Sequence, residues 1–115
     1  QIRQAPKLPL PIQSCRAYIQ KHLGEKLPME VLSEVSGYTP NYLAARFKEE
    51  TGQSVKDYIT EQKIEAARLL LRNSTLDISE ISERLNFTNP SYFSAIFKKR
   101  MGHTPTEYRE AEDRH

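Results

Sequence analysis

Two stretches of this 115-residue chain, 39–50 and 89–100, each combine basic, amide and hydroxyl side chains that could do chemistry. Lysine and arginine attract phosphates, while asparagine and serine can hydrogen-bond base edges in the major groove. Enzyme chemistry is not indicated. The three histidines are scattered, Cys15 is the single cysteine, and neither a Gly-rich phosphate loop nor a nucleophile elbow occurs. We therefore expect no catalytic residue, no metal site and no cofactor.

Helices must position these two stretches, because apolar residues recur at helical spacing and no stretch alternates with period two. Caps, prolines and glycines delimit the helices. They predict helices over about 11–23, 28–36, 40–51, 54–73, 77–85 and 90–101, and a last one from Thr104 onward. Gly24 should end the first helix as a left-handed cap, and Asn86 should end the fifth in the same conformation. Asp77 with Glu80, and Thr104 with Glu107, have the form of capping boxes.

The sequence repeats itself at an interval of 50 residues. Pairs in this register include Pro40 with Pro90, Tyr42 with Tyr92, Phe47 with Phe97, Gly52 with Gly102, Tyr58 with Tyr108, and Glu30 with Glu80. Two copies are too few for a solenoid, so the pattern predicts a duplicated helix-turn-helix. The expected organisation is a tail over 1–10, a first subdomain over 11–53, a central linker helix over 54–72 and a second subdomain over 73–115.

The stretches TPNYLAARFKEETGQSVKDYI and ISERLNFTNPSYFSAIFKKRMGHTPTEYR, bridged by KIEAARLLL, resemble the DNA-binding domain of the AraC/XylS family of bacterial transcription regulators. The resemblance covers roughly 11–110. It implies an all-α, homeodomain-like fold of about seven helices, in which two helix-turn-helix subdomains are joined by a long central helix. It also implies that the second helix of each, about 40–51 and 90–101, enters successive major grooves. A helix fits this groove, and successive grooves lie about 34 Å apart.

Candidate DNA contacts follow from rotating each recognition helix by 100° per residue. Leu43, Phe47, Phe93 and Phe97 turn inward. The base-facing candidates are Asn41, Ala44, Ala45, Arg46, Ser91, Ser94 and Ala95. The phosphate candidates are Tyr42, Lys48, Tyr92, Lys98 and Lys99 on these helices, the caps Thr39 and Asn89 before them, and Lys63 on the central helix, where the resemblance implies a basic residue.

Some positions depart from the family's pattern or leave two interpretations open. Ala45 and Ala95 stand where members often carry arginine, so base readout must rest on other side chains: Asn41, Arg46 at the edge of the face, Ser91, Ser94 and the alanine methyls. Lys63 stands where arginine is usual, and Asn86 where glycine is usual. Two questions about neighbouring residues remain open. Tyr42 and Tyr92 either pack between helices or contact phosphate, while Glu49 and Glu50 either lie away from the groove or accept a cytosine amino group. We expect Cys15 in the core.

The net charge of +2 conceals an uneven distribution along the chain. Residues 84–109 hold five basic and one acidic side chain, whereas 29–83 hold six basic and ten acidic ones. The basic second unit should therefore attract phosphates more strongly than the first.

The expected partners are double-stranded DNA, RNA polymerase, and a sensory or dimerising domain N-terminal to this chain, suggested by its beginning with Gln rather than Met. No membrane partner is expected, because no apolar run reaches 18 residues. The expected location is the cytoplasm, in association with the nucleoid. The alternative function is a helical protein–protein interaction module, which would require an exposed hydrophobic patch.

Overall fold

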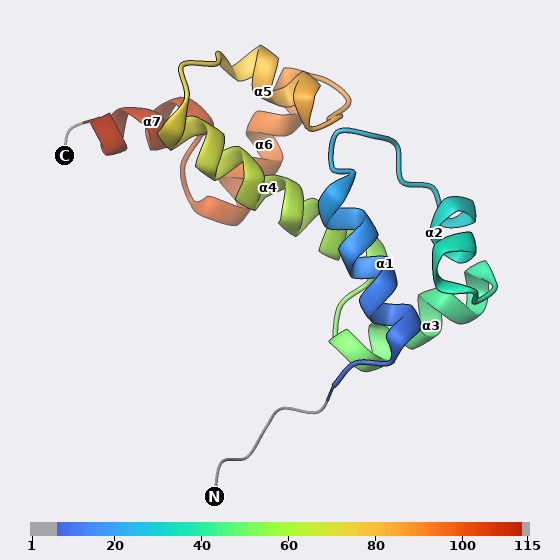
Figure 1. Ribbon diagram of the computed structural model, residues 1–115. Coiled ribbons are helices and arrows are strands. Elements are labelled where there is room, and N and C mark those ends of the chain that lie inside the picture. The colour runs from blue at the N-terminus through green and yellow to red at the C-terminus, as the bar shows by residue number, and fades with distance from the viewer. Residues whose placement is uncertain (1–6, 114–115) are drawn as a thin grey trace, which may run out of the picture. The chain divides into compact units, whose positions relative to one another are not determined.

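The computed structural model describes residues 7–113, which form seven α-helices and no strand (Figure 1). The helices are α1 (Leu10–Lys21), α2 (Met29–Ser36), α3 (Pro40–Thr51), α4 (Val55–Asn73), α5 (Ile78–Arg84), α6 (Pro90–Met101) and α7 (Pro105–Asp113). The all-α prediction of about seven helices is confirmed. None of the helices in this part of the chain combines the length and hydropathy that a membrane crossing requires.

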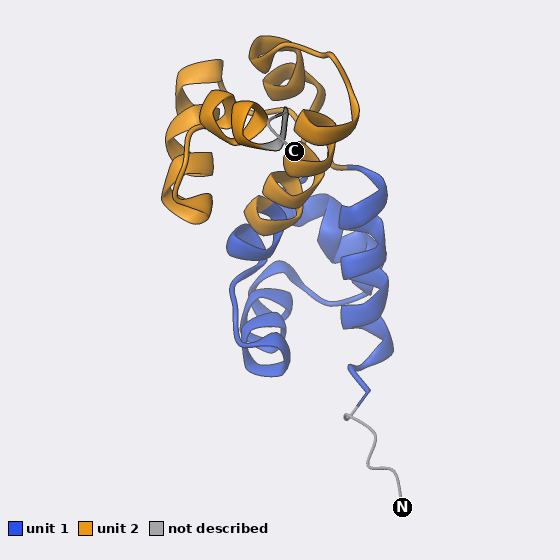
Figure 2. Ribbon diagram, turned by 90° about the vertical axis from the view of Figure 1, so that its left-hand side faces the viewer, with its two compact units in different colours: residues 1–22, 27–59 blue, residues 23–26, 60–115 orange. Residues whose placement is uncertain are grey.

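The chain divides into two compact units (Figure 2). The first comprises the residues up to His22 together with Leu27–Ile59, and the second comprises Leu23–Lys26 together with Thr60 onward. The helix α4 belongs to both units, since its start contributes buried Tyr58 to the first and its remainder contributes buried Ile64 to the second. Each unit is therefore a helix, a helix-turn-helix and a closing helix.

The duplication extends to the first helix of each unit, which the 50-residue register did not reveal. In α1 the buried residues are Ile12, Cys15 and Ile19, and in the second part of α4 they are Ile64, Ala67 and Leu71. Corresponding members of these two sets all differ by 52 in residue number. The end of α4 therefore plays the part in the second unit that α1 plays in the first, although the residue types differ.

The closing helix of each unit docks through a tyrosine. Tyr58 meets the Phe47 ring edge-on with centroids 5.5 Å apart, and Tyr108 meets Phe97 in the same way at 5.6 Å. An arginine from the first helix of the unit reaches each tyrosine. The Arg16 guanidinium lies 5.1 Å from the centre of the Tyr58 ring, and Arg68 Nη1 donates to the Tyr108 hydroxyl at 3.4 Å. These repeated contacts fix the face of α3 and α6 that points inward.

From the cap of its first helix to the cap of its recognition helix, the second helix-turn-helix motif is one residue longer than the first. The N-caps Pro28 and Asp77 differ by 49, as do the left-handed residues Gly37, at φ 80°, and Asn86, at φ 54°. The caps Thr39 and Asn89 of the recognition helices differ by 50. The additional residue lies between Asn86 and Asn89, so the second turn is the longer one.

This change of register corrects one predicted pair. Glu30 is the second residue of α2, whereas Glu80 is the third residue of α5. Glu80 also completes the predicted capping box, since its carboxylate accepts from Asp77 N at 3.2 Å while Asp77 Oδ1 accepts from Glu80 N at 2.8 Å. Glu30 and Glu80 therefore share a sequence interval but not a structural position.

Gly24 also differs from its predicted role as a left-handed helix cap. The helix α1 ends at Lys21, and the positive-φ glycines of the described chain are Gly37, Gly52 and Gly102. A Cβ atom on Gly24 would lie 2.6 Å from the carbonyl oxygen of Arg84. The glycine is needed because loop 23–26 approaches the end of α5 closely, a tertiary constraint within the second unit.

The predicted core position of Cys15 is confirmed, because its side chain is fully buried. Burial raises the pKa of the Cys15 thiol to about 11. The thiol therefore stays protonated at neutral pH and packs as a small apolar side chain.

Candidate nucleic-acid interface

The helix α3 buries the face that was predicted to turn inward. Thr39 caps its start, since Thr39 Oγ1 accepts from Tyr42 N at 3.4 Å, and Pro40 occupies the first helical position. Leu43 and Phe47 are fully buried, which confirms the predicted inward face. The outward side chains that are exposed are Asn41, Tyr42, Ala44, Ala45, Lys48 and Glu49.

The helix α6 repeats this construction in the second unit. Asn89 Oδ1 accepts from Tyr92 N at 2.8 Å, and Phe93 and Phe97 are fully buried as predicted. Ser94 is partly buried. The exposed outward side chains are Ser91, Tyr92, Ala95, Lys98 and Lys99.

Tyr42 and Tyr92 combine features of the two roles considered for them. The Tyr42 ring meets Tyr38 edge-on at 4.8 Å, and the Tyr92 ring lies 6.4 Å from Phe87. Yet Tyr42 is 52% exposed and Tyr92 is 44% exposed. Each ring therefore leans on an aromatic residue of the preceding turn and leaves much of its surface open to solvent.

Arg46, predicted to face the bases at the edge of α3, is engaged by its own helix. Its Nη1 pairs with Glu49 Oε1, and its Nη2 lies 3.0 Å from Glu50 Oε2. The Arg46 side chain is 28% exposed, and its Nε is buried without a partner among the described residues. Both terminal nitrogens of the guanidinium thus point at carboxylates one turn further along α3.

Lys63, predicted to contact phosphate, is engaged within the second unit. Lys63 Nζ donates to the Asn86 carbonyl at 3.2 Å and lies 5.5 Å from the centre of the Phe87 ring. Burial lowers the pKa of Lys63. Its ammonium therefore holds the turn between α5 and α6 at the left-handed residue Asn86.

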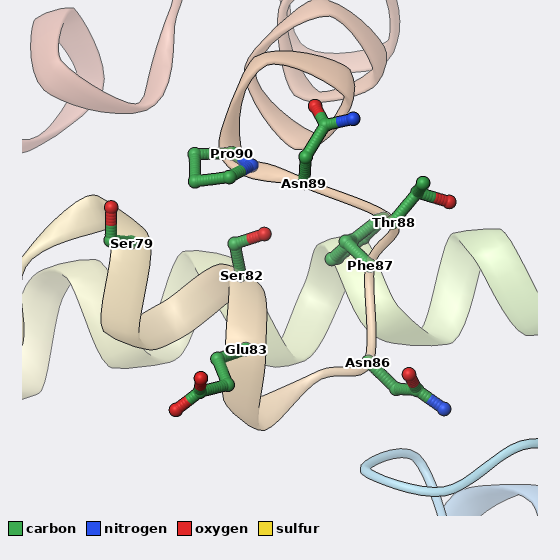
Figure 3. A pocket seen from close by; sticks show the side chains of 8 residues that line it. All are labelled: Ser79, Ser82, Glu83, Asn86, Phe87, Thr88, Asn89 and Pro90. Atoms are coloured by element: carbon green, nitrogen blue, oxygen red, sulfur yellow. The ribbon is translucent and has the colours of Figure 1, made fainter.

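A hollow of about 310 Å³ opens beside this longer turn (Figure 3). Its lining is largely polar and comes from α5, the turn and the start of α6: Ser79, Ser82, Glu83, Asn86, Phe87, Thr88, Asn89 and Pro90. Sequence reasoning did not single out Ser82 or Thr88. The change of interval from 49 to 50 between corresponding caps was the signal that could have found this turn.

Electrostatically the two recognition helices differ. The helix α3 carries two basic residues, Arg46 and Lys48, and two acidic ones, Glu49 and Glu50, so its charges cancel. The helix α6 carries three basic residues in its last turn, Lys98, Lys99 and Arg100, and no acidic residue. The surface of α6 is therefore the stronger attractor of phosphates.

The hydrophobic patch required by a protein-binding module is not evident in the described chain. Its exposed large hydrophobic residues lie on four different helices: Leu10, Tyr42, Leu69 and Tyr92. Two of the four are the recognition-helix tyrosines, whose hydroxyls are polar. The exposed surfaces of α3 and α6 are otherwise small, polar or charged.

Comparison with known proteins agrees with this architecture. A family model described as a helix-turn-helix domain matches residues 32–111. The HTH-type transcriptional regulator YobQ of Bacillus subtilis is 41% identical over 95 residues, which cover 81% of this chain and 39% of YobQ. The chain thus spans less than half the length of this relative.

Two solved structures resemble both units. The C-terminal domain of AraT, a response regulator from Geobacillus stearothermophilus, matches with a TM-score of 0.86 and 36% identity, covering 92% of this chain and 88% of that one. The DNA-binding domain of the global transcriptional factor AdpA, solved in complex with a target DNA, matches with a TM-score of 0.83 and 26% identity. The match covers 88% of this chain and 91% of the AdpA domain.

Proposed function

The chain belongs to the AraC/XylS family of bacterial transcription regulators as a sequence-specific DNA-binding domain, and from that premise we propose that α3 and α6 enter successive major grooves. The observation that carries this proposal is the pair of 12-residue helices with the same cap, proline, buried pair and terminal glycine. Such a pair presents two equivalent outward faces, each of which fits the groove.

The base-reading residues of the proposal are short. They are Asn41, Ala44 and Ala45 on α3, and Ser91, Ser94 and Ala95 on α6. Asparagine can bond adenine through two hydrogen bonds, serine can bond several bases, and an alanine methyl can contact the thymine methyl. Arg46 is left out of this set because its guanidinium is paired with Glu49 and Glu50.

The phosphate-binding residues of the proposal lie at both ends of each recognition helix. The N-terminal group is Thr39, Tyr42, Asn89 and Tyr92, close to the free amide groups at a helix start. The C-terminal group is Lys48, Lys98 and Lys99, which are exposed. Lys63 is left out because its ammonium already bonds the Asn86 carbonyl.

The proposal also covers the rest of the protein, its location and its further partners. Because the chain spans only 39% of YobQ, we propose a further sensory or dimerising domain in the complete protein. We also propose that the domain acts in the cytoplasm in association with the nucleoid, because double-stranded DNA is its partner. Contact with RNA polymerase remains a prediction from the family resemblance.

Selection from a pool of random duplexes tests the docking of both helices. We expect a motif with two conserved blocks about 10 base pairs apart, because that spacing brings two major grooves to one face of the duplex. Fluorescence anisotropy on the selected duplex should show an affinity that falls steeply with salt. A motif with a single block would contradict two-helix docking, and binding without sequence selection would contradict the proposal as a whole.

The role of Asn41 can be tested with the same assay. Asn41→Ala should cost about 1 to 3 kcal/mol on the selected duplex and relax one position of the motif. Ser14→Ala, at an exposed position of α1, serves as the control and should change neither. An unaltered motif from Asn41→Ala would remove this residue from the base-reading set.

A further inference from the structure

Arg46 and its two carboxylate partners form a clamp on α3, defined here as Arg46, Glu49 and Glu50. The partners lie three and four residues along the helix, which places them on the same face as Arg46. Arg46 and Glu50 have side chains only 28% and 27% exposed. Because the pair is partly shielded from water, salt screens it less than it screens a fully exposed pair.

The clamp has no counterpart on α6. In the 50-residue interval of the recognition helices, Arg46 corresponds to Ile96, Glu49 to Lys99 and Glu50 to Arg100. Ile96 packs against the core of the second unit. The clamp is therefore a feature of the first recognition helix alone, and neither the caps nor the core of a recognition helix requires it.

An unclamped arginine at this place would be the strongest DNA ligand on α3. Its planar guanidinium can bind phosphate or guanine through two parallel hydrogen bonds. A phosphate contact of this kind strengthens binding to every sequence, because phosphates carry no sequence information. The clamp directs both terminal nitrogens at Glu49 and Glu50 instead.

We propose that Glu49 and Glu50 limit the affinity of the first recognition helix for every duplex by holding Arg46 away from DNA phosphate. With the clamp closed, α3 contacts DNA through its short side chains, and its affinity is not raised by a further phosphate contact. This inference rests on the proposed insertion of α3 into the major groove.

The test is a mutant cycle measured by anisotropy on the selected duplex and on a scrambled one. Glu49→Gln with Glu50→Gln should open the clamp, raise affinity for both duplexes by about 5-fold and steepen the salt slope by about 1. The ratio between the affinities for the two duplexes should stay about the same, because a phosphate contact favours every sequence alike. Arg46→Met keeps the apolar stem, and alone it should change either affinity by less than about 2-fold, because a clamped arginine contributes little.

The decisive measurement is the triple variant. If the carboxylates act through Arg46, the gain from the two glutamines should vanish in the Arg46→Met background. A gain that persists there would overturn the proposal, since the carboxylates would then repel phosphates directly. A loss of more than about 2-fold from Arg46→Met alone would also overturn it, because Arg46 would already be contacting DNA or the carboxylates left without it would repel phosphates directly.

Controls separate this inference from the proposed function. Glu61→Gln with Glu110→Gln makes the same change in charge at exposed positions on α4 and α7 and should leave affinity unchanged. Circular dichroism confirms that each variant folds. Absence of salt-dependent binding in the unchanged protein would contradict the proposed function. Normal binding with no gain from the glutamine pair would overturn the clamp alone.

Discussion

The recognition helices α3 and α6 have the same arrangement of caps and buried residues, but their exposed surfaces differ. Both begin with a capping side chain and a proline, bury two side chains one turn apart, and end at a left-handed glycine. Yet α3 balances two basic residues with two acidic ones, whereas α6 has three basic residues and none that is acidic. The difference teaches that folding constrains the caps and the buried face, while the outward face is free to diverge toward different contacts.

The turns that precede these helices differ in a related way. In the first unit, Gly37 adopts the left-handed conformation and Ser33 Oγ donates to the Tyr38 carbonyl. In the second, Asn86 takes the glycine's place and Lys63 reaches its carbonyl from α4. By the offset of 52 between the first helices, the counterpart of Lys63 is Pro11, which has no side-chain donor. The second unit thus supports a longer turn with a contact that the first unit cannot make.

Replacing a buried phenylalanine should have the largest effect on the free energy of unfolding, and it tests whether the two cores are equivalent. Phe47→Ala and Phe97→Ala should each cost roughly 3 to 5 kcal/mol of unfolding free energy, because both rings are fully buried. Phe97 contacts two aromatic rings, Phe93 and Tyr108, whereas Phe47 contacts one, Tyr58, in the described chain. Since an aromatic pair adds about 0.5 to 1.5 kcal/mol, Phe97→Ala should be the more costly.

Urea denaturation followed by circular dichroism measures both losses. Ala95→Ser, at an exposed position of α6, is the matched control and should shift the midpoint little. A greater loss from Phe47→Ala would mean that the first core, despite fewer aromatic contacts, is the better packed.

Lysine removal should give the next largest effect and tests the electrostatic difference. Lys98→Ala with Lys99→Ala should weaken binding to every duplex by about 10-fold and reduce the salt slope by about 2, because two phosphate contacts are lost. Lys48→Ala on α3 should reduce the slope by about 1 at most. Lys21→Ala, exposed on α1 outside both recognition helices, is the control for charge. Anisotropy titrations against salt measure all three, and an equal or larger loss from Lys48→Ala would reverse the assignment of the stronger phosphate contacts to α6.

The features that could be predicted from the sequence are those that depend on neighbouring residues in the chain. The caps Thr39 and Asn89, and the left-handed Asn86, follow from side chains that bond or tolerate their own backbone. The buried pair of each recognition helix follows from helical spacing. These features need no knowledge of distant residues, which is why the seven helices were found close to their observed ends.

Sequence could not predict what depends on residues brought together by folding. Gly24 is required by the Arg84 carbonyl, and Lys63 acts on Asn86, 23 residues away. The clamp of Arg46 depends on which of several rotamers the side chain adopts, and its spacing from Glu49 and Glu50 permits pairing without requiring it. The correspondence between α1 and the end of α4 lies in which positions are buried, whereas the residue types at those positions differ.

Substitution in the turns should give the smallest effects and tests how each turn tolerates its left-handed residue. Gly37→Ala should cost about 1 to 2 kcal/mol, and this cost is purely conformational because a Cβ there would have no atom within 4 Å. Asn86→Ala should cost less, about 0.5 to 1 kcal/mol, since asparagine already bears part of the left-handed penalty. Asn86→Gly removes that penalty but gives the unfolded chain more freedom, so it should stay within about 0.5 kcal/mol of the unchanged protein.

The same urea titrations resolve these differences, and Gly37→Asn is the matched reciprocal change. If asparagine matters at position 86 only because its backbone accepts the left-handed conformation, Gly37→Asn should cost less unfolding free energy than Gly37→Ala, and Asn86→Gly should leave DNA affinity unchanged. A loss of stability well beyond 1 kcal/mol from Asn86→Gly would show that the Asn86 side chain itself stabilises the second turn, where it lines the hollow beside α6. The glycine of the first turn and the asparagine of the second would then be different solutions to one backbone requirement, with only the second contributing a side chain.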